Sequence, residues 1–282
     1  MLVTRFAPSP TGLLHRGHAY SALTAQQLAR RAGGRLILRI EDIDAARCRP
    51  QFEQAIHDDL AWLGLDWERP VRRQSEHLAD YAVALERLRA DGLVYRCFKT
   101  RREVLDDIGR APHEAVAPYV GAPLPAEEEA ARLAAGEPFA WRLSLAEAQR
   151  RLGPGWDALA FTEEGLGPCG EYGPQIARPE RAGDVILARK GVGVAYHLAV
   201  TVDDALQGVT DVVRGFDLFE AVNVQRLLQA LLGLPMPIYH HHRLLLRPDG
   251  RRFAKRDRAE TLADLRAQGM SAEVLRAELG FM

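Results

Sequence analysis

The first eighteen residues constrain the fold more than any other stretch of the chain. Segment 2–6 has the composition of a short strand, and Pro8, Pro10 and Gly12 end it, because proline lacks an N–H donor and glycine permits a sharp turn. Apolar residues at helical spacing then predict a helix over 19–32. The order of strand, loop and helix places free N–H groups at a helix N-terminus, where they suit an anion.

A second strand is predicted over 35–40, parallel to the first and joined to it by the helix in a right-handed crossover. The acidic residues Glu41, Asp42 and Asp44 follow this strand directly. Ligands of open α/β sheets gather at the carboxyl ends of the strands. We therefore expect the acidic cluster to face a substrate, and a solvated acidic loop is the alternative.

His15, Gly17 and His18 form a His-x-Gly-His pattern at the start of the predicted helix. Alone, this pattern could equally be a turn with two surface histidines. Together with the preceding Arg-Phe-Ala-Pro-Ser-Pro-Thr-Gly of residues 5–12, it resembles the signature of class I aminoacyl-tRNA synthetases, and within them the glutamyl group. The resemblance implies ATP as a substrate and assigns His15, Gly17 and His18 to its binding site.

The same resemblance implies a site for L-glutamate. Two later stretches, 196–204 and 211–215, match motifs of the family, and Glu41 matches the residue that binds the substrate ammonium. A guanidinium can fork onto a carboxylate, so Arg214 or Arg5 could select the γ-carboxylate over an amide. The residues that the resemblance assigns to glutamate are Arg5, Phe6, Ala7, Pro8, Ser9, Glu41, Tyr196 and Arg214.

Basic residues are dense between 240 and 258, which suits phosphate binding, although a solvated basic loop is the alternative. The stretch is similar in part to the Lys-Met-Ser-Lys-Ser loop of the family. Lys255 keeps the second lysine, Arg252 replaces the first, and Ala254 lacks the serine hydroxyl. The resemblance implies that Lys255 is catalytic together with the two histidines. It also implies that Arg252 and Lys255 bind ATP, with Mg²⁺ carried by the nucleotide.

Short relatives in this group can hold zinc through Cys-x-Cys, a tyrosine and a further cysteine. Here Cys97 is followed by Lys99 where the second cysteine would stand, and Tyr119 is followed by Ala122 and Pro123 without a cysteine. One thiolate cannot complete a tetrahedral site. We therefore expect no structural zinc and predict no metal ligands.

The expected fold class is α/β, with a Rossmann-like nucleotide-binding domain that carries the His-x-Gly-His (HIGH-type) motif. An inserted α+β subdomain and a short C-terminal helical segment complete the expected fold. The predicted segments are the first half of the catalytic domain (1–97), an acceptor-binding-like insert (98–183), the second half (184–233), and the KMSKS-like loop with a C-terminal helix (234–282). Further strands are predicted over 93–97, 139–145, 159–162, 184–190, 194–202 and 208–213, and further helices over 50–64, 75–90, 218–232 and 271–279.

Composition bears on the cellular compartment and the partners of the protein, but not on the reaction it catalyses. The formal net charge of -1 does not point to nucleic acid by itself, although a local basic face could still bind it. The sequence shows no membrane span and no signal peptide, and its three scattered cysteines fit free thiols in a reducing compartment. We expect a cytoplasmic protein without a membrane partner.

After Lys255 only 27 residues remain, so we expect no counterpart of the anticodon-binding region of a full glutamyl-tRNA synthetase. Over almost its whole length the chain resembles a truncated branch of the group that attaches glutamate to queuosine. That resemblance implies ATP-dependent, tRNA-independent activation of L-glutamate to glutamyl-adenylate. Transfer to queuosine at the wobble position of tRNA(Asp) would follow, in an enzyme expected to act as a monomer.

Three alternatives remain open from the sequence. The chain could be a minimal glutamyl-tRNA synthetase that charges a tRNA 3′ end. It could be a different nucleotidyltransferase that shares His-x-Gly-His. It could also be a non-catalytic tRNA-binding paralogue, an alternative suggested by the altered residues around Lys255.

Overall fold

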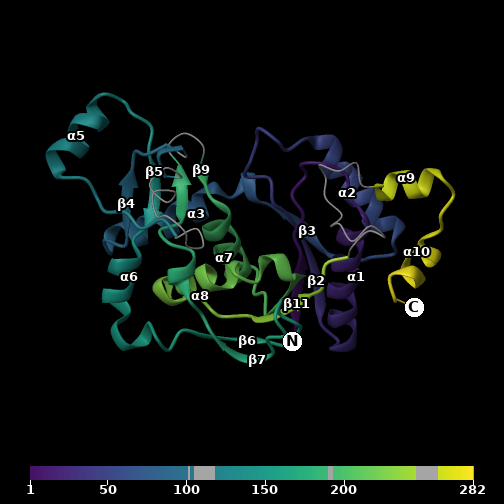
Figure 1. The fold of residues 1–282 in the computed structure, drawn as a ribbon. Coiled ribbons are helices and arrows are strands. Elements are labelled where there is room, and N and C mark those ends of the chain that lie inside the picture. The colour runs from purple at the N-terminus through teal and green to yellow at the C-terminus, as the bar shows by residue number, and fades with distance from the viewer. Residues whose placement is uncertain (101, 105–117, 190–192, 246–259, 282) are drawn as a thin grey trace.

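A seven-stranded sheet forms the centre of the molecule (Figure 1). The computed structural model describes residues 1–100, 102–104, 118–189, 193–245 and 260–281. The first six strands of the sheet are parallel, and the seventh is antiparallel to its neighbour. In spatial order the strands are β3 (Glu68–Arg73), β2 (Arg35–Ile40), β1 (Val3–Phe6), β10 (Asp211–Gly215), β11 (Ile238–His242), β6 (Ala160–Glu163) and β7 (Gly173–Ile176).

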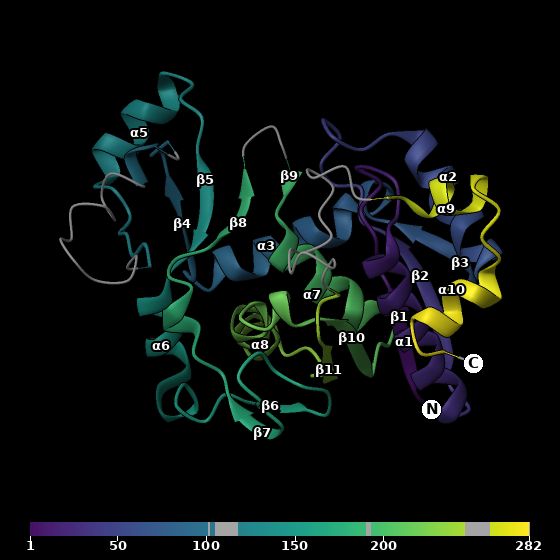
Figure 2. The same cartoon turned by 45° about the vertical axis from the view of Figure 1, so that its right-hand side comes forward.

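A second, antiparallel sheet lies beside the first (Figure 2). Its strands are β4 (Val94–Cys97), β5 (Ala140–Leu143), β8 (Ile186–Arg189) and β9 (Gly193–Val194). It therefore takes strands from both sides of the predicted insert as well as from within it, while β6 and β7 extend the large sheet. The residue boundaries proposed for the domains stay a prediction.

Helices cover both faces of the large sheet and create two apolar cores. Along β2, Leu36 and Leu38 pack with α1 and α2, whereas Ile37 packs with α3, α7 and α8, because successive strand residues point to opposite faces. The described helices are α1 (Arg16–Arg31), α2 (Pro50–Trp62), α3 (Leu78–Ala90), α5 (Ala126–Ala134), α6 (Leu145–Leu152), α7 (Tyr196–Leu206), α8 (Ala221–Leu232), α9 (Leu262–Ala267) and α10 (Ala272–Glu278). Among the described residues, none of the helices has the length and apolar character needed to cross a membrane.

The predicted fold class is confirmed, with a parallel Rossmann-like sheet and a separate antiparallel sheet. The β1–α1–β2 unit follows the predicted order, although α1 begins at Arg16 rather than at residue 19. The three earlier residues enter the helix because the His15 side chain caps it, a signal that apolar spacing does not carry.

The strand predicted over 194–202 is wrong. Only Gly193 and Val194 form a strand, and α7 then runs from Tyr196 to Leu206. Valine and threonine favour strands, but every residue of α7 from Leu198 to Asp204 is buried. A helix that is buried all round lacks the amphipathic period by which a helix is recognised.

The sequence analysis also missed β3, β7, β11, α5, α6 and α9. Strand β3 lies at the sheet edge and contains Pro70 among charged residues, so it shows no apolar alternation. Strand β11 contains three consecutive histidines, and such a run is not the apolar pattern by which a buried strand is recognised. The C-terminal helix predicted over 271–279 is present as α10.

Candidate active site

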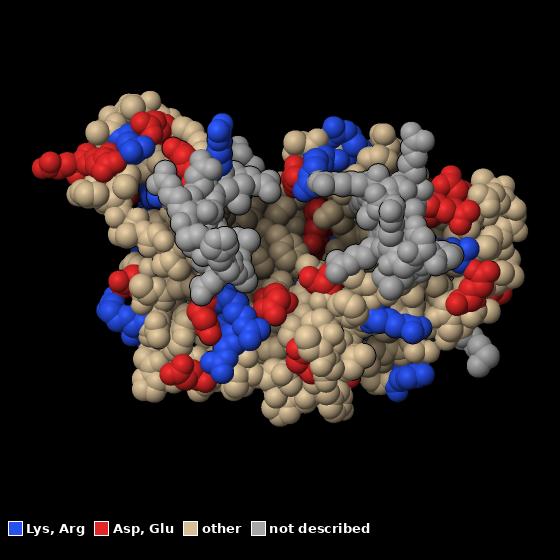
Figure 3. Space-filling view, in the orientation of Figure 1, with Lys and Arg blue, Asp and Glu red and all other residues tan. Residues whose placement is uncertain are grey.

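The candidate site lies at the switch point of the large sheet. Strand β1 lies between β2 and β10, and the chain leaves β1 in opposite directions along the sheet to reach them. Because these strands are parallel, the loop after β1, Glu41 after β2 and Arg214 near the end of β10 meet at one edge. Figure 3 shows this face hollowed between the side of the small sheet and the side of α2 and α9.

The two histidines of the first loop form the N-terminus of α1. The His15 Nδ1 atom accepts a hydrogen bond from Gly17 N (3.1 Å), and the His18 Nδ1 atom accepts one from His15 N (3.2 Å). Their ring centroids lie 3.8 Å apart. Since each Nδ1 accepts, each neutral ring carries its proton on Nε2, which is then a donor. The backbone N–H groups of His15, Gly17 and His18 already have partners within this turn, so the donors that suit phosphate oxygens here are the two ring N–H groups.

A cavity of about 310 Å³ opens at this helix terminus. His15, His18, Gly215 at the end of β10 and Leu245 line it. Thr261 pairs with His15 in an isolated bridge, and Leu262 N donates to Leu14 O (2.9 Å). Both flanks of segment 246–259 therefore lie at this cavity. Arg252 and Lys255 belong to that segment and lie outside the described residues.

An ion network holds the residues around Glu41. Asp204 Oδ1 accepts from Arg39 Nη2 (2.7 Å) and from Arg5 Nε (3.1 Å). Arg39 Nε lies 3.5 Å from Glu41 Oε1, and the Arg39 side chain is fully buried. The two cations lower the pKa of Asp204 despite its burial. Sequence reasoning missed Arg39, whose only signal was an arginine flanked by apolar residues within a strand.

The loop after β1 contacts Glu41 through its backbone. Phe6 is buried in the core with α1, and Pro8 O accepts from Glu41 N (3.0 Å). Ala7 and Ser9 are half-buried in the same loop, so the backbone of this loop fixes where Glu41 stands.

Glu41 has an unusual pKa for a carboxyl. Burial disfavours its charged form and raises the pKa of Glu41 to about 7, although Arg39 and Arg5 act in the opposite direction. If its carboxylate binds the substrate ammonium, the proton must first leave.

We therefore expect the KM for glutamate to rise about tenfold for each pH unit between about pH 7 and pH 5, and to level off above pH 7. The sign follows from the raised pKa, since Glu41 takes up a proton as the pH falls through 7. The test is glutamate-dependent ATP–pyrophosphate exchange across this range at saturating MgATP. A glutamate KM that stays constant would remove Glu41 from ammonium binding.

Arg214 and Tyr196 meet at the ends of β10 and α7. Arg214 Nη1 donates to the Tyr196 hydroxyl (3.5 Å), and Arg214 Nε donates to His241 Nε2 (3.0 Å). Arg214 is only 5% exposed, and its Nη2 atom has no hydrogen-bond partner within the described part of the chain. Burial raises the pKa of the Tyr196 hydroxyl, and the charges of Arg214, Glu41 and Arg5 lie near enough to influence it.

Cys97 and Tyr119, the two residues that match the zinc pattern of the short relatives, lie close together. Cys97 Sγ lies 3.8 Å from the Tyr119 hydroxyl. Nearby, Asp184 accepts hydrogen bonds from Tyr95 OH (2.8 Å) and Gly121 N (2.9 Å) and ties the small sheet to this loop. No group of three or more His, Cys, Asp or Glu side chains that could hold a metal ion occurs among the described residues.

A parallel sheet with His-x-Gly-His at the N-terminus of its first helix is typical of the nucleotide-binding domain of class I aminoacyl-tRNA synthetases. The family described as tRNA synthetases class I (E and Q), catalytic domain, matches residues 1–281. The chain belongs to this family, and membership implies the use of ATP.

Individual relatives match along the whole chain. A glutamyl-Q tRNA(Asp) synthetase of Rhodobacter capsulatus is 47% identical over 99% of this chain and 100% of its own length. A protein of the same name from Symbiobacterium thermophilum is 42% identical over 100% of this chain and 86% of its own length. The crystal structure of a glutamate-tRNA synthetase from Elizabethkingia anophelis aligns with a TM-score of 0.75 at 26% identity, covering 95% of this chain and 54% of that one.

Proposed function

We propose that this protein activates L-glutamate with ATP and transfers it to queuosine at the wobble position of tRNA(Asp). The arrangement around Tyr196 carries the proposal. A carboxylate at Glu41 can take the substrate ammonium, and a buried guanidinium at Arg214 can take the γ-carboxylate. The full-length similarity to the Rhodobacter capsulatus relative supports queuosine in tRNA(Asp) as the acceptor.

The chemistry needs no protein nucleophile. An α-carboxylate oxygen of glutamate attacks the α-phosphorus of ATP, the bond to the pyrophosphate oxygen breaks, and pyrophosphate leaves with the bonding electrons. A queuosine hydroxyl then attacks the carbonyl carbon of the adenylate, and AMP leaves. The protein contributes position and charge, because both reactants are held and negative charge grows on phosphate oxygens.

In this proposal the Nε2–H groups of His15 and His18 donate to phosphate oxygens, and Gly17 lets the nucleotide approach the helix backbone. Arg252 and Lys255 add positive charge from segment 246–259. Mg²⁺ arrives with the triphosphate. We propose that no structural zinc is required and that the enzyme acts as a monomer in the cytoplasm, where tRNA and ATP are found.

The activation step is tested by ATP–pyrophosphate exchange without tRNA. Glutamate should support exchange, whereas glutamine and aspartate should not. Exchange that does not depend on an amino acid would indicate a different nucleotidyltransferase. Binding of tRNA without any exchange would indicate a non-catalytic paralogue.

A further inference from the structure

We propose that Glu163 and His241 are positioning residues that hold the Arg214 guanidinium for a substrate carboxylate and so select glutamate over glutamine. The inference rests on the proposed function and extends it to two residues that do not touch the substrate. Neither residue was singled out by the sequence.

The three side chains form a chain of hydrogen bonds from β6 through β11 to β10. Glu163 Oε2 lies 2.5 Å from His241 Nδ1, and His241 Nε2 accepts from Arg214 Nε at 3.0 Å. The side chains of Glu163 and His241 are both fully buried. A buried carboxylate must be paired, and here its partner is a histidine that contacts a site arginine.

The chemistry of arginine fixes where the histidine proton lies. Arg214 Nε–H can only donate, so His241 Nε2 must present its lone pair. The ring proton then sits on Nδ1 and is donated to Glu163. Burial lowers the pKa of His241, which keeps the ring neutral. Burial alone would raise the pKa of Glu163, but hydrogen bonds from His241 outweigh it and the pKa is lowered, which keeps the carboxylate charged.

Glu163 is itself held in place. Its Oε1 atom accepts from His241 N (2.9 Å) and from Gly165 N (2.8 Å). The chain after β6 runs tightly along β11, since a Cβ atom on Gly165 would lie only 2.2 Å from His241 O. With both oxygens of Glu163 engaged, the His241 ring has one orientation and one tautomer.

We infer that the outer edge of the buried guanidinium binds the ligand. Nε is used by His241, Nη1 reaches Tyr196 OH only at 3.5 Å, and Nη2 has no hydrogen-bond partner among the described residues. Two parallel N–H donors match the two oxygens of a carboxylate. The amide of glutamine would place an NH₂ group against one of these donors, so a fixed guanidinium rejects it.

Glu163→Gln is the test, because it keeps the size of the side chain and changes which nitrogen of His241 carries the proton. The carbonyl oxygen of the introduced amide would keep the two backbone donors, and its NH₂ group would then face His241 Nδ1. The histidine would have to carry its proton on Nε2, against the Arg214 Nε–H. In ATP–pyrophosphate exchange we expect the KM for glutamate to rise at least about thirtyfold and the preference over glutamine to fall by a similar factor, with the KM for ATP unchanged within about twofold.

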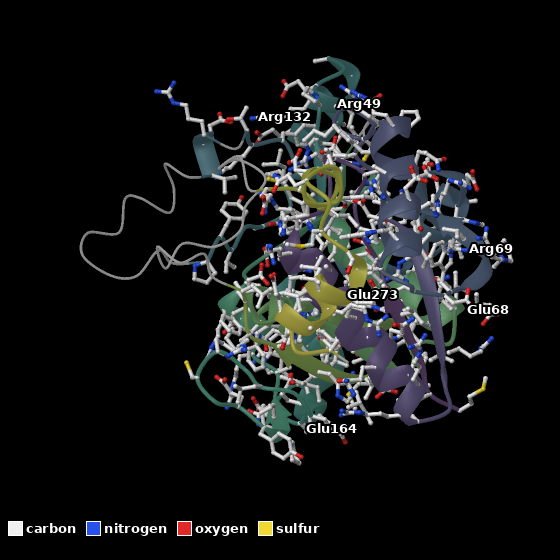
Figure 4. The ribbon with its side chains drawn as sticks, turned by 90° about the vertical axis from the view of Figure 1, so that its right-hand side faces the viewer. Arg49, Glu68, Arg69, Arg132, Glu164 and Glu273 are labelled. Carbon is white, nitrogen blue, oxygen red and sulfur yellow. The ribbon has the colours of Figure 1, made fainter. Side chains whose placement is uncertain are left out.

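The matched control is Glu164→Gln, the same change one residue later on an exposed side chain (Figure 4). It should leave both KM values unchanged. His241→Gln should retain much of the glutamate affinity, because its amide oxygen can accept from Arg214 and its NH₂ group can donate to Glu163, whereas His241→Leu should lose it. Equal losses of glutamate and ATP affinity in the Glu163 variant would show a merely structural role and overturn the proposal.

Nitrogen-15 NMR of labelled histidine provides a second readout that does not depend on activity. We expect His241 to show the Nδ1–H tautomer in the wild type and the Nε2–H tautomer in Glu163→Gln. The Nε2–H tautomer in the wild type would overturn the proposal even if the enzyme is active. A wild type that does not activate glutamate would contradict the proposed function, while the tautomer would still decide the hydrogen-bond arrangement.

Discussion

Arg214→Lys is expected to lower kcat/KM for glutamate at least about a hundredfold in ATP–pyrophosphate exchange. The guanidinium uses Nε for His241, and in the proposed complex Nη1 and Nη2 donate to the γ-carboxylate. A lysine has one side-chain nitrogen, which cannot donate to His241 and also form two parallel hydrogen bonds to a carboxylate. Loss of two hydrogen bonds to a charged group costs about 3 kcal/mol or more, and each 1.4 kcal/mol is tenfold.

The control for this substitution is Arg30→Lys, the same change at an exposed position on α1. The KM for ATP should stay within about twofold of the wild type in both variants, since neither side chain lines the cavity beside His15. An Arg214→Lys enzyme with an unchanged kcat/KM for glutamate would show that another residue, such as Arg5, binds the γ-carboxylate.

The second large effect is on stability. Asp203→Asn should lower the free energy of unfolding by about 3–5 kcal/mol, because it takes the charge from a carboxylate with no exposed surface. Asp203 accepts from Arg72 Nε (2.7 Å), Gln74 Nε2 (2.8 Å) and Tyr81 OH (2.9 Å) and so joins α7 to β3 and α3. An asparagine would place a donor among these donors and leave Arg72 with a weaker partner.

Thermal unfolding measures this effect, and the midpoint should fall by roughly 10 °C at this chain length. Asp157→Asn, the same change on an exposed loop, should leave the midpoint within about 1 °C. Equal midpoints for the two variants would show that the Asp203 network contributes little to stability.

The parts of the site that follow a local pattern could be predicted from the sequence. Proline and glycine mark the end of β1, and a glycine pair follows the end of helix α1. The first strand, loop and helix were therefore recognisable. Glu41 follows a strand, and parallel strands bring their carboxyl ends together. Arg214 lay in a motif of the family, and the structure places it beside Tyr196.

The residues that sequence analysis missed act through contacts between distant segments. Glu163 and His241 are 78 residues apart, and only the pairing of β6 with β11 brings them together. Arg39 resembles a surface residue by composition, but its partners Asp204 and Gln207 come from α7 and its C-terminal end. The region of helix α7 was predicted as a strand, so the contacts of Arg39 with Asp204 and Gln207 could not be predicted.

The measurement that tests the proposed function most directly is the transfer of labelled glutamate, with ATP, onto tRNA from cells with and without queuosine. We expect label only on the queuosine-containing tRNA, and it should follow tRNA(Asp) on separation. Equal label on both tRNA preparations would contradict the account and identify a minimal enzyme that charges the 3′ end of a tRNA.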